Sequence, residues 1–281
     1  MENLGYYCGS YGLIEDMKIP MNDRVCYFGD GVYDATYTAN HIIYRLEEHI
    51  DRFYKSAGLL DLKIDYTKTE LITILQDLVK KVDSPEQFLY WQITRGTAMR
   101  NHAFPEPKVP SNLWITIKPG SIKDIYQKIK LITVEDTRYF HCNIKTLNLL
   151  PNVMASQKAF AAGCDEAVFH RGDRITECTH SNISIIQNGI LKTAPLDNLI
   201  LPGITRGHLL IFCRQNNIPV DESPFTVKEL MEADEVIITS SGSLCIAASE
   251  INNIPVGGKS PVILTSLQTA AIKDFEQGTQ K

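Results

Sequence analysis

Two stretches in the first half of the chain repeat apolar residues at intervals of three and four, as the buried face of a helix does. Residues 46–58 place Leu46 and Ile50 on one face and end at Gly58, and residues 69–82 repeat the pattern. Glycine commonly follows the last turn of a helix because it adopts positive φ without strain. We therefore predict two amphipathic helices here.

Short runs of β-branched and aromatic residues predict strands in both halves of the chain. The expected strands are residues 87–94, 112–118, 129–134, 167–169, 183–186, 190–193 and 235–239. Asn188 and Gly189 separate two of them and indicate a tight hairpin turn. Further helices are expected at residues 152–162, where Asn152 would be the N-cap, 205–215 and 265–276.

Pro119 and Gly120 interrupt this pattern, because proline lacks a backbone donor and glycine favours turns. Before them helices and strands are mixed, and after them strands dominate. We therefore predict an α+β protein made of a small α/β domain at residues 1–118, a linker at 119–122 and a larger β-rich domain at 123–281.

Composition narrows the classes of function. The 281 residues are 44% hydrophobic and 22% charged, which suits a folded protein and excludes wholesale disorder. Lys and Arg number 28 against 33 Asp and Glu, so the net charge of −5 provides no basic field for nucleic acid or an anionic membrane. We therefore expect neither nucleic acid nor an anionic membrane surface as a partner.

The apolar runs, the N-terminal charges and the cysteines indicate the cellular compartment. The longest apolar runs are far shorter than a membrane span, and the first basic residue, Lys18, comes too late for the charged start of a secretory signal. Seven scattered cysteines without a CxxC pair indicate a reducing compartment and no structural zinc or other metal site. We expect a soluble cytoplasmic protein.

Lys145 is the only Asp, Glu, Lys or Arg between Tyr139 and Gln157. A lysine normally stands among other charges on a solvated face. One that stands among apolar and amide residues is a candidate for a partly desolvated amine that forms a Schiff base. The alternative is a lysine whose stem lies along apolar residues while its ammonium reaches solvent.

Two turns rich in glycine and hydroxyl groups are candidates for binding an anion. Residues 201–207 lead into the helix expected at 205–215, and the free N–H groups at a helix N-terminus favour phosphate. Residues 240–243 follow an expected strand and offer further donors. The alternative is that Thr205 is an ordinary helix cap.

Glu177 interrupts an otherwise apolar strand, where a carboxylate would pair with a buried cation or a protonated ring nitrogen, unless it is simply exposed. Arg100 and His102 point the same way if their segment is extended and would then form a carboxylate clamp. The alternative for them is a solvated loop. Tyr33 follows two glycines, so its hydroxyl either reaches a substrate or lies in the core.

These fragments occur in an order and spacing that resemble the fold-type IV pyridoxal-phosphate enzymes. The resemblance spans nearly the whole chain. It rests on the motifs YFGDGVY (27–33), HIDR (49–52), IKTLNLLPN (144–152), ITE (175–177), LPGITR (201–206) and ITSS (238–241). Within that group, Arg100 and His102 resemble the Arg-x-His carboxylate trap of the D-amino-acid aminotransferases, which the branched-chain enzymes generally lack.

The resemblance implies pyridoxal 5'-phosphate as the cofactor. Lys145 would form the Schiff base and then move a proton at the substrate Cα, and Glu177 would keep the pyridine nitrogen protonated. The groups implied to hold the phosphate are Arg52, the N–H groups of Ile204 and Thr205, and the hydroxyls of Thr205, Ser240 and Ser241.

The resemblance also implies the reaction and the assembly. Tyr33, Arg100 and His102 would bind the substrate carboxylate, with the last two reaching the site from the second subunit of a homodimer. The implied reaction passes an amino group from D-alanine-like donors to 2-oxoglutarate or pyruvate. The sequence departs from the group in having Cys178, Thr179 and His180 after Glu177, where small hydroxyl residues are usual, and Gly242 after the second turn's serines.

Three other functions stay open on the sequence. Within the group they are a branched-chain L-amino-acid aminotransferase and an aminodeoxychorismate lyase. The third is a non-catalytic module that binds a phosphorylated ligand at residues 203–205, which would need neither Lys145 nor Glu177.

Overall fold

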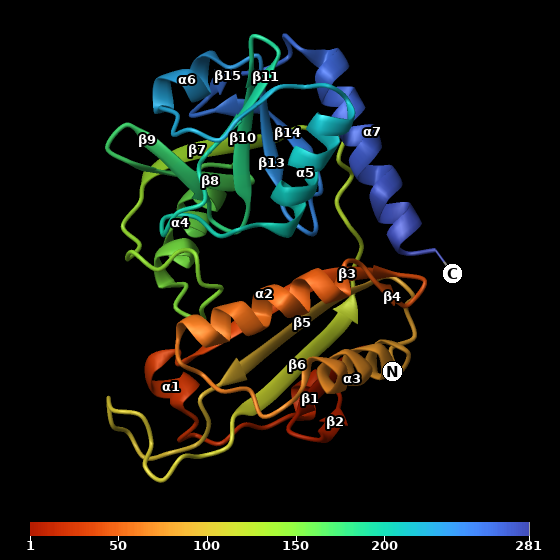
Figure 1. Ribbon diagram of the computed structural model, residues 1–281, viewed down its shortest axis with the longest axis vertical. Coiled ribbons are helices and arrows are strands. Elements are labelled where there is room, and N and C mark those ends of the chain that lie inside the picture. Colours follow the sequence, from red (N-terminus) through yellow and green to blue (C-terminus); the bar gives the residue numbers. More distant parts are fainter. Residues whose placement is uncertain (281) are drawn as a thin grey trace. The chain divides into compact units, whose positions relative to one another are not determined.

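The computed structural model describes residues 1–280, and these form two compact units (Figure 1). Of the described residues, unit 1 contains 1–121, 144–148 and 276–280, and unit 2 contains 122–143 and 149–275. The segment 144–148, expected from the sequence in the larger domain, therefore belongs to unit 1. The N–H of Tyr33 donates to the carbonyl of Lys145 at 2.9 Å, and Val32 forms an antiparallel bridge with Thr146.

Unit 1 is built on an antiparallel sheet of six strands in the order β2-β1-β6-β5-β3-β4. The strands are β1 (Leu4–Tyr7), β2 (Ser10–Gly12), β3 (Gly31–Ala39), β4 (Ile42–Ile43), β5 (Gln87–Thr94) and β6 (Asn112–Pro119). β5 has the bounds expected from the sequence, and β6 is one residue longer. The other four strands were not predicted.

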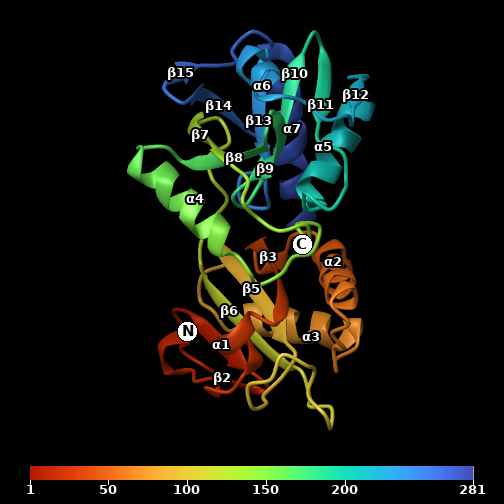
Figure 2. The same ribbon diagram turned by 90° about the vertical axis from the view of Figure 1, so that its left-hand side faces the viewer.

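Two amphipathic helices cover one face of this sheet. The short elements of unit 1 are η1 (Ile14–Asp16) and α1 (Arg24–Phe28), and its long helices are α2 (Leu46–Leu59) and α3 (Lys68–Val79). Figure 2 shows α2 and α3 on the same side of the sheet. Phe53 of α2 and Leu75 of α3 are buried with Trp91 and Ile115 of the strands in one apolar core, so both predicted helices exist. The expectation that the first ends at Gly58 is wrong, because α2 runs through Gly58 and its C-cap is Leu60. The second helix ends at Val79, three residues before the expected 82.

Unit 2 contains a mixed sheet of nine strands in the order β12-β11-β10-β13-β14-β7-β8-β9, with β15 paired to β14 (Figure 1). The strands are β7 (Ile129–Glu135), β8 (Glu166–Arg171), β9 (Arg174–Cys178), β10 (Asn182–Gln187), β11 (Ile190–Thr193), β12 (Val220–Asp221), β13 (Glu235–Thr239), β14 (Ile246–Ile251) and β15 (Ile254–Pro255). The pairs β14–β7, β7–β8 and β11–β12 are parallel, and the remaining pairs are antiparallel.

The remaining helices are α4 (Leu150–Ala161), α5 (Ile204–Gln215), α6 (Val227–Glu232) and α7 (Pro261–Gly278). The expectation that Asn152 caps α4 is wrong. The helix begins two residues earlier because Pro151 is tolerated in a first turn, where no N–H bond is needed. The amide of Asn152 instead donates to the carbonyl of Thr179 at 2.7 Å. Across residues 1–280 no helix is both long and apolar enough to cross a bilayer.

Candidate active site

Lys145 lies in unit 1, where its backbone is held between β3 and α2. Its carbonyl accepts from Tyr33, and its N–H donates to the hydroxyl of Ser56 at 3.2 Å. Its ammonium lies 4.4 Å from the centre of the Tyr33 ring. The structure thus brings together the candidate Schiff-base lysine and one of the three candidate carboxylate-binding side chains.

Gly31 permits this close approach of the segment 144–148 to the sheet. A Cβ built on Gly31 would lie 2.3 Å from the carbonyl oxygen of Ile93 and 2.7 Å from a methyl group of Leu147. Because these distances are far below van der Waals contact, a side chain here would displace the segment that carries Lys145.

Arg52 belongs to a buried group of three side chains in the same unit. Its guanidinium binds both oxygens of Asp34, with Nε 2.9 Å from Oδ2 and Nη2 2.7 Å from Oδ1. His49, one turn earlier on α2, places Nδ1 2.7 Å from Asp34 Oδ1. Asp34 is fully buried on β3. Neither partner of Arg52 was predicted from the sequence, although His49 and Arg52 are spaced three residues apart on one helix face.

Electrostatics fix the charge states in this group. Burial alone would raise the pKa of Asp34, but Arg52 and His49 outweigh it, so the pKa lies well below its usual value. Burial is also the largest influence on His49 and lowers its pKa. A neutral imidazole must therefore donate from Nδ1 to the carboxylate, which only accepts. The result is a fixed orientation for the guanidinium of Arg52.

Arg100 and His102 are exposed on the loop between β5 and β6, and one aromatic ring brings them together. The Arg100 guanidinium lies 5.2 Å from the centre of the Phe28 ring, and the His102 ring centre lies 5.2 Å from the same point. From the sequence, Arg100 and His102 were expected to point the same way because they are two residues apart in an extended segment. In the structure they lie near each other because both contact the ring of Phe28, the last residue of α1.

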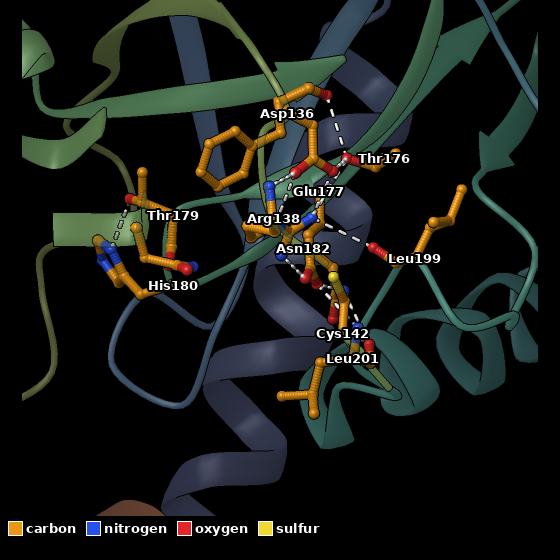
Figure 3. A network of polar contacts seen from close by, with 12 residues as sticks. Asp136, Arg138, Cys142, Thr176, Glu177, Thr179, His180, Asn182, Leu199 and Leu201 are labelled. Carbon is orange, nitrogen blue, oxygen red and sulfur yellow. Dashed lines mark hydrogen bonds and ion pairs between the residues drawn. The ribbon is translucent and has the colours of Figure 1, made fainter. Parts of the chain in front are cut away.

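Glu177 lies in unit 2, on β9, at the centre of a polar network (Figure 3). It is only 6% exposed, so the alternative of an exposed strand glutamate is wrong. Oε1 accepts from Nη1 of Arg138, while Oε2 accepts from the Asn182 amide at 3.2 Å and from the Leu201 N–H at 2.9 Å. Three donors, one of them a guanidinium, favour the ionised carboxylate.

Arg138 joins Glu177 to a second buried carboxylate (Figure 3). Its Nε and Nη2 each lie 2.9 Å from an oxygen of Asp136, which also accepts from the Thr176 hydroxyl at 3.1 Å. Burial would raise the pKa of Asp136, but its hydrogen bonds and ion pair with Arg138 lower it below the usual value. Arg138 was not predicted from the sequence, because nothing in its local pattern marks a partner 39 residues away.

Ile204 and Thr205 are the first two residues of α5, whose N-cap is Gly203 and not Thr205. The alternative of ordinary capping by Thr205 is therefore wrong. Because the N-cap is a glycine, no side-chain cap occupies the N–H groups of the first turn. A Cβ on Gly203 would lie 1.9 Å from Oδ1 of Asn182, so only glycine allows this turn to pass so close to Asn182. The helix start thus keeps backbone donors suited to an anion.

Asn182 also connects this turn to the second hydroxyl-rich turn of unit 2. It pairs with Thr239 across β10 and β13, and Ser240 and Ser241 follow directly. The Thr239 hydroxyl is buried and has no hydrogen-bond partner within residues 1–280. The hydroxyl of Ser240 accepts from the N–H of Ser243 at 3.1 Å, which closes the turn.

His180, the departure noted in the sequence, points away from the Glu177 network (Figure 3). Its Nδ1 lies 3.1 Å from Glu166 Oε1 and 3.1 Å from the Thr179 hydroxyl, and more than half of its side chain is exposed. Its bulk is therefore accommodated at the surface of unit 2.

A family model for amino-transferase class IV matches residues 31–251, which include both Lys145 and Glu177. The chain belongs to the class IV aminotransferases. The D-alanine aminotransferase of Listeria monocytogenes serotype 4b (strain F2365) is 40% identical to this aminotransferase over 269 residues, or 94% of this chain and 93% of the relative. The D-alanine aminotransferase of Bacillus licheniformis is 38% identical over 270 residues, or 95% of each chain.

Solved structures share the fold of this aminotransferase. The branched-chain amino acid aminotransferase from Escherichia coli superposes with a TM-score of 0.89 at 21% identity, covering 100% of this chain and 97% of the other. The branched-chain aminotransferase from Thermoproteus uzoniensis, solved with norvaline, gives a TM-score of 0.87 at 22% identity, covering 99% and 96%. Another branched-chain enzyme was solved with pyridoxamine 5'-phosphate and also gives a TM-score of 0.87. The predicted fold class is therefore confirmed.

Proposed function

We propose that this class IV aminotransferase uses pyridoxal 5'-phosphate to transfer an amino group from D-alanine-like donors to 2-oxo acids such as 2-oxoglutarate and pyruvate. The observation that carries the proposal is 40% identity to a D-alanine aminotransferase over 94% of the chain. The two side chains gathered around Phe28, Arg100 and His102, support it, because a guanidinium and an imidazole suit a substrate carboxylate.

The donors and acceptors of the chain fit this cofactor. The start of α5 offers backbone N–H groups without a side-chain cap, and Thr205, Ser240 and Ser241 add hydroxyls, a set suited to a phosphate. A buried carboxylate held by three donors suits a protonated ring nitrogen. Lys145 offers a primary amine. Arg52, oriented by Asp34, adds a positive charge for the phosphate.

When bound, pyridoxal phosphate supplies an aldehyde that exchanges amino groups and a ring that withdraws electrons from the substrate Cα. In our proposal Lys145 holds the cofactor through Nζ and then moves the proton at Cα. Glu177 stays ionised beside Arg138 and accepts the hydrogen bond of the ring nitrogen. Tyr33, Arg100 and His102 bind the substrate carboxylate and thereby determine which face of Cα is presented to the lysine.

We further propose that the enzyme is a homodimer in the cytoplasm. One side of α4 exposes Leu150, Val153, Met154 and Phe160, an apolar surface of the kind that marks protein interfaces. All seven cysteines are free thiols, as in a reducing compartment. Sedimentation of wild type against Val153→Glu tests the dimer. We expect a two-chain species that the charged variant weakens, and a monomeric wild type would contradict the proposal.

The test of the activity is a paired assay with purified protein and added pyridoxal phosphate. D-Alanine and L-alanine are each supplied with 2-oxoglutarate, and pyruvate is measured. We expect pyruvate from D-alanine, whereas exclusive use of L-alanine or L-leucine would refute the proposed handedness. Lys145→Ala protein purified in parallel controls for contaminating transaminases and racemases.

A further inference from the structure

One buried arginine holds the loop that carries Arg100 and His102. Arg24, on α1, is only 3% exposed. Its Nη1 donates to the carbonyl oxygen of Asn101 at 2.7 Å and to that of Ala103 at 3.2 Å. These two carbonyls belong to the residues on either side of His102, and Asn101 directly follows Arg100. Since residues 98–104 form no helix or strand, the two bonds fix the backbone where both side chains leave it.

Asp30 holds Arg24 in turn. Arg24 Nε donates to Asp30 Oδ2 at 2.7 Å, and Arg95 Nε lies 3.1 and 3.0 Å from the two oxygens of the same carboxylate. Arg95 stands at the start of the loop, and its guanidinium lies 3.6 Å from the centre of the Phe104 ring. One carboxylate thus ties two arginines together. Of these two arginines, Arg24 bonds to the carbonyls that flank His102, whereas Arg95 bonds to those of Leu60 and Asp61.

The ring of Phe28 completes the arrangement. Arg24 lies 4.9 Å from its centre, and Arg100 and His102 each lie 5.2 Å from it. The attraction of a cation to an exposed aromatic face is enough to bias a rotamer but not to order a loop. Arg24 supplies the ordering, through charge-assisted bonds to the backbone, and Phe28 supplies a common surface for the two side chains.

We propose that Arg24 is a positioning residue for the substrate carboxylate, acting by fixing the carbonyls of Asn101 and Ala103 so that Arg100 and His102 are presented together. This inference rests on the proposed function. Binding groups must be held within about 0.5 Å of their productive geometry, and a loop without strand pairing does not achieve this alone. The planar fork of arginine reaches a carboxylate and two carbonyls at once, whereas the single ammonium of lysine does not.

The experiment compares wild type with Arg24→Met and Arg24→Lys in the holoenzyme. We expect the KM values for D-alanine and for the 2-oxo acid to rise about tenfold or more in Arg24→Met, because both substrates carry the carboxylate and the lost bonds are charge-assisted. We expect kcat to change less than about threefold and the visible band of the bound cofactor to stay the same. Arg24→Lys keeps a positive charge beside Asp30, so the buried carboxylate stays compensated, and its KM should rise almost as much.

Arg95→Met is the matched control, because it removes the same kind of side chain from the same carboxylate but leaves the two loop carbonyls bonded to Arg24. Its KM should stay within about threefold of wild type. A double-mutant cycle with Arg100→Ala gives the readout that a merely structural role would not move. If Arg24 acts through Arg100, Arg24→Met should raise KM much less in the Arg100→Ala background than it does in the wild type.

Two results would overturn the inference in an enzyme that uses D-alanine: an unchanged KM in both Arg24 variants, or full additivity in the cycle. Amide hydrogen exchange over residues 99–104 separates this failure from that of the proposed function. Exchange that rises in Arg24→Met supports the anchoring of the loop even if D-alanine is not used. In that case the assignment of the substrate fails, and with it the proposed function. Unchanged exchange refutes the anchoring whatever the substrate.

Discussion

Replacing Arg138 by methionine should destabilise unit 2 strongly and in a pH-dependent way. Methionine keeps much of the volume of the side chain but removes every donor. Arg138 lies between the buried carboxylates of Asp136 and Glu177, and it also donates to the Leu199 carbonyl at 3.2 Å. Removing one partner of a buried ion pair costs about 3–5 kcal/mol, because the remaining charge is uncompensated.

The sign of the pH dependence follows from Asp136. In the wild type its pKa is lowered, since the bonds from Arg138 outweigh burial. The group therefore contributes stability that is present above the unfolded pKa and lost as the pH falls through the folded value. In the variant, burial dominates and the pKa rises. The loss of unfolding free energy in the variant, relative to wild type, should thus be largest at pH 8. It should shrink as the pH approaches about 5, where the carboxylates of the variant take up protons.

Thermal unfolding of the cofactor-free protein at the two pH values is the assay. At about 2–4 °C per kcal/mol for a domain of this size, the transition of unit 2 should fall by about 6–20 °C at pH 8. Arg174→Met is the control, because its ion pair with Asp197 is about one-third exposed and should contribute at most about 1 kcal/mol. A loss no larger than that of the control, or a deficit that grows on acidification, would refute the reasoning.

Three further predictions concern the proposed site. Glu177→Gln should retain the cofactor but lower kcat by about 100-fold or more, because a neutral amide does not keep the ring nitrogen protonated; an unchanged kcat would assign that task to another acid. Arg52→Ala should loosen the cofactor about ten- to hundredfold, from about 1.5–3 kcal/mol of lost charge-assisted bonding; dialysis that strips variant and wild type equally fast would contradict this. Arg100→Ala should raise the KM for D-alanine sharply with cofactor binding unchanged, and mixing it with Lys145→Ala chains should restore activity if Arg100 serves the partner subunit. Mixtures as inactive as their components would place Arg100 in its own subunit's site.

Much of the fold follows from local patterns, and its exceptions have physical causes. β5, β11 and β13 have the bounds expected from their apolar and β-branched residues. β3 was not predicted, and it contains a buried aspartate, a residue type that is depleted in strands. Asp34 is tolerated there because Arg52, 18 residues along the chain, neutralises its charge and His49, 15 residues along, bonds to it. No local pattern contains that compensation.

The site residues also divide into those that local sequence marks and those that depend on distant partners. Lys145 and Glu177 became candidates from the sequence because each is a charged residue in a segment that is otherwise uncharged or apolar, and the family resemblance then selected them. Arg138 and Arg24 were not found, since their partners are distant in sequence. Arg24 bonds to carbonyls 77 and 79 residues away. Chemistry that a residue performs itself can be marked locally, whereas the positioning of other groups depends on tertiary structure.

The most direct test of the proposed site is to identify the lysine that carries the cofactor. The protein is loaded with pyridoxal phosphate, reduced with borohydride so that the cofactor stays attached, digested, and mapped by mass spectrometry. We predict a single labelled peptide with the modification on Lys145, and no label in Lys145→Ala protein treated in the same way. A label on a different lysine of the wild type, or equal labelling of the variant, would contradict the assignment.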